Sequence, residues 1–290
     1  MATLPPPKLI ATDLDGTLLR SDGTLSDRTP AALAAAEQAG IRVVLVTGRP
    51  PRSVPELLAG IGPHFVIAAN GAAVYAPDGT LAHMSPIRPL AATRLVTRVR
   101  RVLPGAAFAV EYDGGFGHEP TYPPWSFGEE AAEPVGTAGE LLTRLPGRPV
   151  LKILAYHPTL PLDDFYERAL RTAGSNAETT YSTGLSLVEF SAPRVTKATT
   201  LLAWSGRLGV ASDEIAAFGD MPNDLPMLTA VGHSYAMANA HPDVLRAASH
   251  RAPANDEDGV AQVLEGFVDT LSSSQRATVA PAAYPDRSTR

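Results

Sequence analysis

Short apolar runs alternate with helical patterns in both halves of the chain, and this alternation constrains the fold more than any other feature. In the first half, apolar runs at 9–12, 42–47 and 65–70 accompany an alanine-rich helical pattern at 30–39. Parallel strands joined by helices have this texture, because each crossover uses a helix and both faces of each strand are buried. The sequence therefore predicts an α/β fold with a doubly wound, Rossmann-like parallel sheet.

The alternation returns near the end of the chain. We expect a helix over 196–208, a strand over 215–219, a helix over 224–230 and a strand over 235–238. These strands are again continuous apolar runs, as buried parallel strands are. The two halves are therefore expected to build one sheet.

The middle of the chain has a different texture, with strands farther apart and frequent aromatic, Pro and Gly residues. This indicates an inserted α+β cap domain. After Leu271 the sequence has Ser, Ala, Pro and charge without periodicity, which predicts a disordered tail. The predicted division is a core of residues 1–84 and 188–270, a cap of residues 85–187 and a tail of residues 271–290.

Composition excludes several classes of function. The 290 residues include no cysteine, which excludes disulfides, thiolate nucleophiles and zinc–thiolate sites. The net charge is −6 and the one basic cluster, at 94–101, is expected to be a solvated helix face, so no nucleic-acid partner is predicted. No run approaches the roughly 20 apolar residues of a membrane span and no signal-peptide pattern is present, so we expect a cytoplasmic protein without a membrane partner.

Two aspartates directly follow the first apolar run. Asp13 and Asp15 lie in LIATDLDGT, and alternate residues of an extended chain point to the same side. Two unpaired carboxylates about 4 Å apart repel by roughly 4 kcal/mol at an effective dielectric of about 20, so a cation is expected beside them. A turn with helix-capping aspartates is the alternative interpretation of this pattern.

A second carboxylate cluster follows another apolar run. The sequence FGDMPND places Asp220, Asn223 and Asp224 at the carboxyl end of the strand expected over 215–219. Ligands bind at this edge of open α/β sheets. Hard oxygen ligands without cysteine or a histidine pair indicate Mg²⁺.

Two further polar positions occur at the ends of expected elements. Thr47 and Gly48 follow the strand in VVLVTGR, where a hydroxyl and an N–H suit phosphate oxygens, and Lys197 lies at an expected helix start. Surface or turn roles are the ordinary interpretation of each one alone. Their order and their strand-end placement favour a shared site.

Together, DLDGT, VTGR, Lys197 and GDMPND resemble, in order, the four motifs of the haloacid dehalogenase superfamily of phosphatases. AANGA at 68–72, YAMANA at 235–240 and NDEDGVA at 255–261 resemble the Cof-type branch, in which a class IIB cap lies between the second and third motifs. The resemblance covers about residues 8–270. Lys197 is followed by Ala where the branch commonly has Gly, and the cap matches only loosely, so no cap contacts are carried over.

The resemblance implies a role for each motif residue. Asp13 would be the nucleophile that forms an aspartyl-phosphate, and Asp15 would protonate the leaving oxygen and later activate water. Mg²⁺ would be held by Asp13, the backbone carbonyl of Asp15, and Asp220. The implied catalytic set is Asp13, Asp15, Thr47 and Lys197; the implied phosphate contacts are Leu14, Thr47, Gly48, Lys197 and Asn223, with Asp224 supporting Lys197 or a metal-bound water.

The activity implied is hydrolysis of a small phosphorylated metabolite, with a sugar phosphate as the expected substrate and a monomer or small homo-oligomer as the expected assembly. A sugar phosphomutase using the same aspartyl-phosphate, and a non-catalytic metabolite-binding protein on the same scaffold, are the alternatives. Arg49 and Glu189 are interpreted as structural residues. A polar and aromatic cap cluster is weighed for leaving-group contacts, against the simpler reading as cap core and solvated loops: Tyr112, Asp113, His118, Glu119, Tyr122 and Trp125.

Overall fold

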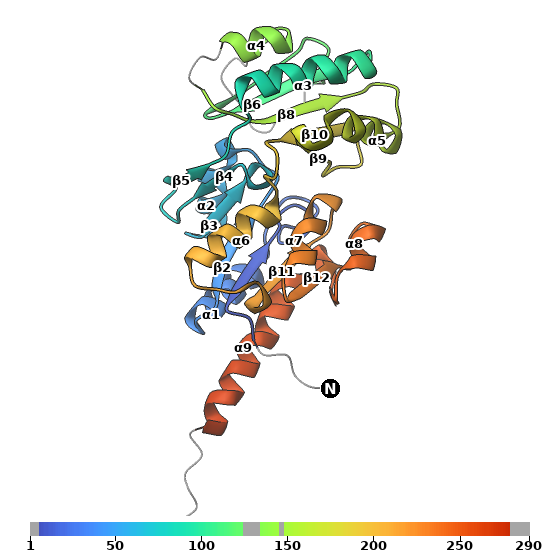
Figure 1. The fold of residues 1–290 in the computed structure, drawn as a ribbon. Helices are drawn as coiled ribbons and strands as arrows, with labels where there is room; N and C mark the ends of the chain where they lie inside the picture. The colour runs from blue at the N-terminus through green and yellow to red at the C-terminus, as the bar shows by residue number, and fades with distance from the viewer. Residues whose placement is uncertain (1–5, 124–133, 145–147, 279–290) are drawn as a thin grey trace, which may run out of the picture.

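The larger of two sheets forms the core of the protein. The computed structural model describes residues 6–123, 134–144 and 148–278. Figure 1 shows the core below and the cap above it. In spatial order the eight core strands are β13 (His250–Ala252), β12 (His233–Met237), β11 (Ile215–Gly219), β1 (Leu9–Thr12), β2 (Arg42–Val46), β3 (Phe65–Ala68), β4 (Ala73–Tyr75) and β5 (Leu81–Met84).

The core sheet is parallel from β13 to β3, and β4 and β5 extend it as an antiparallel edge. All four residues of β1 are buried, so the sheet is covered on both faces, which confirms the predicted doubly wound α/β core. The core helices are α1 (Arg28–Gln38), α2 (Val54–Ile61), α6 (Lys197–Arg207), α7 (Leu225–Ala230), α8 (Pro242–Ala247) and α9 (Gly259–Thr278).

Strand order places three motifs next to one another. β1 lies between β11 and β2, with Thr12 opposite Phe218 on one side and Leu45 on the other. The segments that follow these three strands therefore leave the same edge of the sheet together. α6 begins near this edge in a capping box, in which the Thr196 side chain accepts from the Thr199 N–H and Thr199 reciprocates.

The cap is a five-stranded antiparallel sheet with helices on its outer face (Figure 1). Its strands in spatial order are β7 (Gly115–His118), β6 (Ala107–Tyr112), β8 (Val150–Tyr156), β10 (Leu187–Ser191) and β9 (Glu178–Thr180). Its helices are α3 (Pro89–Val102), α4 (Ala138–Arg144) and α5 (Leu162–Ala173). Apolar side chains from these helices and from alternate strand positions form a core of their own, which leaves the other positions of β6, β8 and β10 facing the larger domain.

Two predicted boundaries differ from the structure. The boundary between residues 187 and 188 cuts through β10, which pairs with β8 and β9, so the cap sheet continues to Ser191. LVEFS is buried along its whole length and contains no turn residue, and the return to the core begins at Ala192 and Pro193. The predicted tail is wrong for 271–278, where α9 continues, and its remainder, 279–290, lies outside the described residues.

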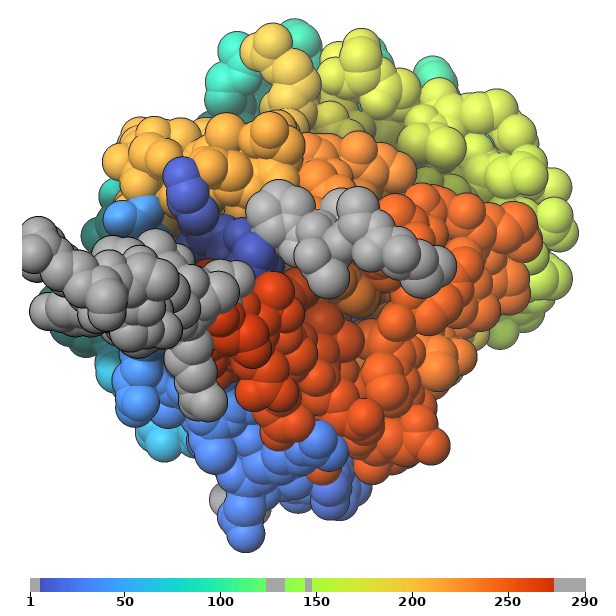
Figure 2. All heavy atoms as spheres, turned by 90° about the horizontal axis from the view of Figure 1, so that it is seen from below, coloured from blue at the N-terminus to red at the C-terminus, as the bar shows by residue number. Residues whose placement is uncertain are grey.

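Helix α9 packs against α1 at the end of the core opposite the cap. Figure 2 shows this end, where the red C-terminal helix lies beside blue N-terminal segments. Val260, Ala261 and Leu264 are buried in the first turns, and Arg28 pairs with Glu265 at 2.5 Å. A helix anchored in this way extends readily through residues of fair helix propensity such as Ser, Gln and Arg. In the described part of the chain, no helix has both the length and the apolar character needed to cross a bilayer.

Candidate active site

Four motif residues meet at the carboxyl edge of the core sheet. Asp13 follows β1, Thr47 follows β2, Asp220 follows β11, and Lys197 is the first residue of α6. Each of these residues is buried. The structure thus brings together residues that are up to 207 positions apart in the sequence, as their strand-end positions predict.

Lys197 lies between two buried carboxylates. Its Nζ is 2.5 Å from Asp13 Oδ1 and 2.7 Å from Asp224 Oδ1. Burial alone would lower the pKa of Lys197, but the two carboxylates outweigh burial and raise it, so the side chain stays charged. Asp224 Oδ2 also accepts the N–H groups of Asp220 and Met221, both at 3.1 Å. Asp224 therefore orients Lys197 and the loop that carries Asp220.

The acidic groups outnumber the cation in this cluster. Carboxylate oxygens of Asp13, Asp220 and Asp224 lie within 4.8 Å of one another, against one ammonium group from Lys197. Burial, followed by the neighbouring carboxylates, raises the pKa of Asp220 to about 7; burial also raises the pKa of Asp13 well above its ordinary value, although Lys197 opposes this rise. A divalent cation would relieve this excess negative charge, and the all-oxygen donor set fits Mg²⁺.

The glycine of DLDGT is required for the shape of the cluster. Gly16 has φ +74°, and a Cβ at this position would lie 2.3 Å from Asp220 Oδ2. The Gly16 carbonyl accepts from Asn239 Nδ2 at 2.8 Å, and Asn239 Oδ1 accepts from the N–H of Asn255 at 3.1 Å. The motifs around residues 239 and 255 therefore hold the loop that follows β1.

The Asp15 carboxylate is not part of the buried cluster of Asp13, Asp220 and Asp224, contrary to the expectation that it converges with Asp13. It is 57% exposed and pairs with Arg49, with Nη2 2.5 Å from Oδ1 and Nε 2.9 Å from Oδ2. The alternation of side chains fails here because β1 ends at Thr12, Leu14 lies in a turn, and Asp15 forms an isolated bridge with Leu19. Arg49, interpreted from the sequence as structural, therefore holds the residue to which the resemblance assigns proton transfer. Metal contact through the Asp15 backbone carbonyl stays a prediction.

The residues implied in phosphate binding form a second polar group beside the carboxylates. Thr47 Oγ1 accepts the Arg49 N–H at 3.0 Å, and Asn223 Nδ2 donates to Asn70 Oδ1 at 3.2 Å. A Cβ on Gly48 would lie 3.1 Å from Asn70 Oδ1 and 3.7 Å from Asn223 Nδ2, so this group surrounds Gly48. Leu14 lies in the turn after β1, where its carbonyl accepts from Thr17 and Leu19, and its phosphate contact stays a prediction.

Two cap residues, Lys152 and the Glu189 that was interpreted from the sequence as structural, also reach this group. Lys152 Nζ donates to the Gly48 carbonyl, and Glu189 accepts from Asn70. Elsewhere between the domains, Arg52 pairs with Glu111 of β6. The signal was a charged residue inside an otherwise apolar strand, as in VLKILAY and LVEFS. A charged residue of this kind indicates a contact with the core only when the core-facing side of the cap sheet is known.

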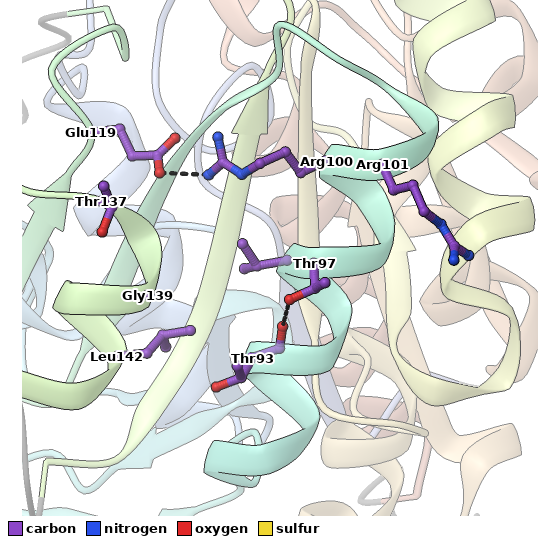
Figure 3. A pocket seen from close by; sticks show the side chains of 9 residues that line it. Thr93, Thr97, Arg100, Arg101, Glu119, Thr137, Gly139 and Leu142 are labelled. Carbon is purple, nitrogen blue, oxygen red and sulfur yellow. Dashed lines mark hydrogen bonds and ion pairs between the residues drawn. The ribbon is translucent and has the colours of Figure 1, made fainter.

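The cap cluster weighed from the sequence divides into separate places. Tyr112 is part of the cap core, and Trp125 lies outside the described residues. Figure 3 shows Glu119 facing Arg100 at a pocket of about 540 Å³ between α3 and α4. Glu119 also accepts the N–H groups of Phe108 and Ala138, so it joins cap elements on the outer side of the sheet. Tyr112 and Glu119 therefore have structural roles in the cap.

Comparison with known proteins gives consistent results. A family model described as haloacid dehalogenase-like hydrolase matches residues 10–264. The chain is 30% identical over 251 residues to an HMP-PP phosphatase of Cronobacter sakazakii, which covers 84% of this chain and 88% of the relative. It is 27% identical over 265 residues to the 5-amino-6-(5-phospho-D-ribitylamino)uracil phosphatase YcsE of Bacillus subtilis, and this match covers 90% of this chain and 96% of the relative. The solved HAD subclass IIB sugar phosphatase BT4131 has a TM-score of 0.75 at 20% identity, covering 90% of this chain and 98% of that one, a likeness of fold alone.

Proposed function

The chain belongs to the haloacid dehalogenase-like hydrolases, and from this premise we propose that it hydrolyses a small phosphomonoester through an aspartyl-phosphate on Asp13. Within the family it is a Cof-type phosphatase with a class IIB cap. The observation that carries the proposal is the buried Lys197–Asp13 pair beside Asp220, at the carboxyl ends of β1 and β11. A nucleophilic carboxylate needs this neighbouring positive charge to approach an anionic phosphoryl group.

The first step transfers the phosphoryl group to the enzyme. Lys197 holds Asp13 Oδ1, so we assign the attack on phosphorus to Oδ2. A new bond forms between Oδ2 and phosphorus, the bond from phosphorus to the ester oxygen breaks, and the leaving oxygen takes a proton from the Asp15 carboxyl group. Asp15 is assigned this proton because the resemblance implies that role for the second aspartate of DLDGT, and Arg49 holds its carboxylate in the segment that follows Asp13.

The second step returns the enzyme to its starting state. Asp15, now ionised, takes a proton from a water molecule whose oxygen attacks phosphorus, and the bond to Asp13 breaks to release inorganic phosphate. Both carboxyl groups regain their original protonation. During both steps Thr47, Gly48, Lys197 and Asn223 would bind the phosphoryl oxygens and hold them in line with the attacking atom.

Mg²⁺ is the proposed cofactor, with Asp13, Asp220 and the Asp15 backbone carbonyl as its protein ligands. Asp224 is assigned a supporting role, because its two carboxylate oxygens already serve Lys197 and two backbone N–H groups. When bound, the ion would offset negative charge on the phosphoryl oxygens.

The substrate is proposed to be a sugar phosphate or a comparable small phosphorylated metabolite. The relatives are named for small phosphorylated compounds, and the cap stands over the site, where it can enclose a molecule of this size. Substrates of this kind favour a cytoplasmic location, with the enzyme as a monomer or small homo-oligomer. A sugar phosphomutase remains the second candidate, because it would share the same aspartyl-phosphate.

The test is Asp13→Asn, which keeps the size of the side chain and removes the nucleophilic carboxylate. Phosphate release from p-nitrophenyl phosphate and a panel of sugar phosphates should fall at least about 10³-fold, while circular dichroism stays that of the wild type. EDTA should abolish wild-type release and Mg²⁺ should restore it. Turnover retained by Asp13→Asn would refute the assignment of Asp13 as the nucleophile. Transfer of phosphate between sugar positions without release of inorganic phosphate would favour the phosphomutase.

A further inference from the structure

A chain of buried polar side chains connects the cap sheet to the core residues that are implied in phosphate binding. Lys152 on β8 and Glu189 on β10 form an ion pair, with Nζ 2.9 Å from Oε1. Lys152 Nζ also donates to the Gly48 carbonyl at 2.9 Å, and Glu189 Oε2 accepts from Asn70 Nδ2 at 2.6 Å. Both charged residues are nearly inaccessible, at 3% and 4% exposure. They therefore bind the core through directed hydrogen bonds.

Lys152 fixes one peptide group of the phosphate-binding loop. The carbonyl that it binds belongs to the peptide between Gly48 and Arg49, and the N–H of that same peptide donates to Thr47 Oγ1 at 3.0 Å. Because this N–H occupies an acceptor site on the hydroxyl oxygen, the Thr47 proton has to point elsewhere. Lys152 thereby keeps the Thr47 hydroxyl available as a donor to another group.

Glu189 fixes the direction of two side-chain amides. An ionised carboxylate only accepts hydrogen bonds, so Asn70 must turn its Nδ2 to Glu189 and its Oδ1 to Asn223. Asn223 in turn must present its Nδ2 donor beside Gly48. This direction has a cost, because the buried Asn223 Oδ1 has no hydrogen-bond partner among the residues that the structure describes.

Stability alone does not account for a buried pair at this position. Apolar residues of similar volume often stabilise a fold as well as a buried ion pair does. β10 lies between β8 and β9, so Glu189 is an interior residue of the cap sheet. A separate ion pair, between the partly exposed Arg52 of the core and the buried Glu111 of the cap, joins the two domains without contacting Gly48 or Asn70. The Gly48 and Asn70 contacts are thus not the only polar contacts between the cap and the core in the described residues.

We propose that Lys152 and Glu189 are positioning residues for phosphoryl transfer. With the cap seated, they aim the Thr47 hydroxyl and the Asn223 amide as donors toward the phosphoryl oxygens. The inference rests on the proposed phosphatase function and adds two cap residues to it. It makes the geometry of the phosphate-binding group depend on a domain that contributes none of the motif residues.

The experiment compares Glu189→Gln with the matched control Glu111→Gln. Both residues lie on core-facing strands of the cap, both pair with a cation, and Glu111 is 3% exposed against 4% for Glu189. With p-nitrophenyl phosphate and Mg²⁺, Glu189→Gln should lower kcat about 10-fold or more and change KM less than about 3-fold. Glu111→Gln should leave kcat within about 3-fold of the wild type. Orthovanadate mimics the five-coordinate transition state, whereas inorganic phosphate resembles the product. In Glu189→Gln, inhibition by orthovanadate should weaken more than inhibition by inorganic phosphate. In Glu111→Gln the two should not differ in this way.

Lys152→Met provides a second variant that removes the donors and retains the stem. It should lower kcat on the order of 30-fold; Tm is measured for every variant, and if this one does not fold, Glu189→Gln decides. Equal kcat losses in Glu189→Gln and Glu111→Gln, or an unchanged kcat in Glu189→Gln, would overturn positioning. Failure of the phosphatase proposal is distinguishable, because then the wild type shows no Mg²⁺-dependent turnover or Asp13→Asn retains it.

Discussion

Metal binding by the acidic cluster should compete with protons near neutral pH. Burial, together with Asp224, raises the pKa of Asp220 to about 7 in the metal-free protein. A carboxyl ligand has to be deprotonated to bind Mg²⁺, so affinity falls as pH drops below this value. One group with this pKa is roughly one tenth ionised at pH 6 and nine tenths at pH 8, which makes the apparent Kd about tenfold weaker at pH 6. The raised pKa of Asp13 would steepen this dependence.

The same pKa also sets how the stability of the metal-free protein depends on pH. Because the carboxyl pKa is higher in the folded state than in the unfolded state, the folded state binds more protons between about pH 4 and pH 7. The free energy of unfolding therefore decreases as pH rises through this window. Mg²⁺ relieves the repulsion among ionised carboxylates, so its stabilising effect should be larger at pH 8 than at pH 6.

Titration calorimetry with MgCl₂ at pH 6, 7 and 8, at constant ionic strength, measures the first effect, and Tm in EDTA and in Mg²⁺ measures the second. Asp220→Asn should bind Mg²⁺ weakly at every pH, whereas the exposed carboxylate variant Asp243→Asn should behave as the wild type. Equal Kd values at pH 6 and 8, or a Tm in EDTA that rises from pH 5 to pH 7, would refute the reasoning.

Two further variants test the packing of the site, one of them with a matched glycine control, and a third tests an ion pair at the opposite end of the core. Lys197→Met leaves Asp13 and Asp224 without a counter-charge and should cost about 3–5 kcal/mol at pH 7.5 and less at pH 5 in urea unfolding, with turnover lost; equal losses at both pH values would contradict this. Gly16→Ala adds a clash with Asp220 to a strained φ and should weaken Mg²⁺ binding. Its control is Gly40→Ala, which has φ +87° but open space around the new methyl group, so it should cost only about 1–2 kcal/mol in stability and leave the Mg²⁺ Kd unchanged. Equal Kd values in the two variants would argue against the clash. Arg28→Ala breaks the exposed pair with Glu265 and should leave the urea midpoint of unfolding close to that of the wild type, because solvent screens an exposed pair; a large drop in the midpoint would contradict this.

The sequence predicts most of the core fold because buried parallel strands have an unmistakable apolar pattern. The strands at 9–12 and 215–219 are found with the predicted bounds, and the motifs after them meet as expected. Asp15 was misplaced because the alternation of side chains applies only inside a strand. The helix through 271–278 was missed because its stability comes from the turns packed before it.

The cap contribution to the site could not be predicted in the same way. Lys152 and Glu189 each stand as a single charged residue in an apolar strand, and which face each occupies depends on pairing between segments 37 residues apart. Asn70 lies in the motif AANGA at 68–72, but Glu189, which accepts its hydrogen bond, belongs to the cap. Contacts between domains depend on docking geometry, for which local periodicity carries no information.

The most direct test of the account is to identify the residue that becomes phosphorylated during turnover. The wild type is mixed with substrate and Mg²⁺, quenched in acid within the first turnovers, digested and analysed by mass spectrometry. The account predicts one added phosphoryl group on the peptide that contains LIATDLDGT, located on Asp13 and absent from Asp13→Asn. A phosphoryl group on any other residue, or rapid turnover with no phosphorylated peptide at any quench time, would contradict it.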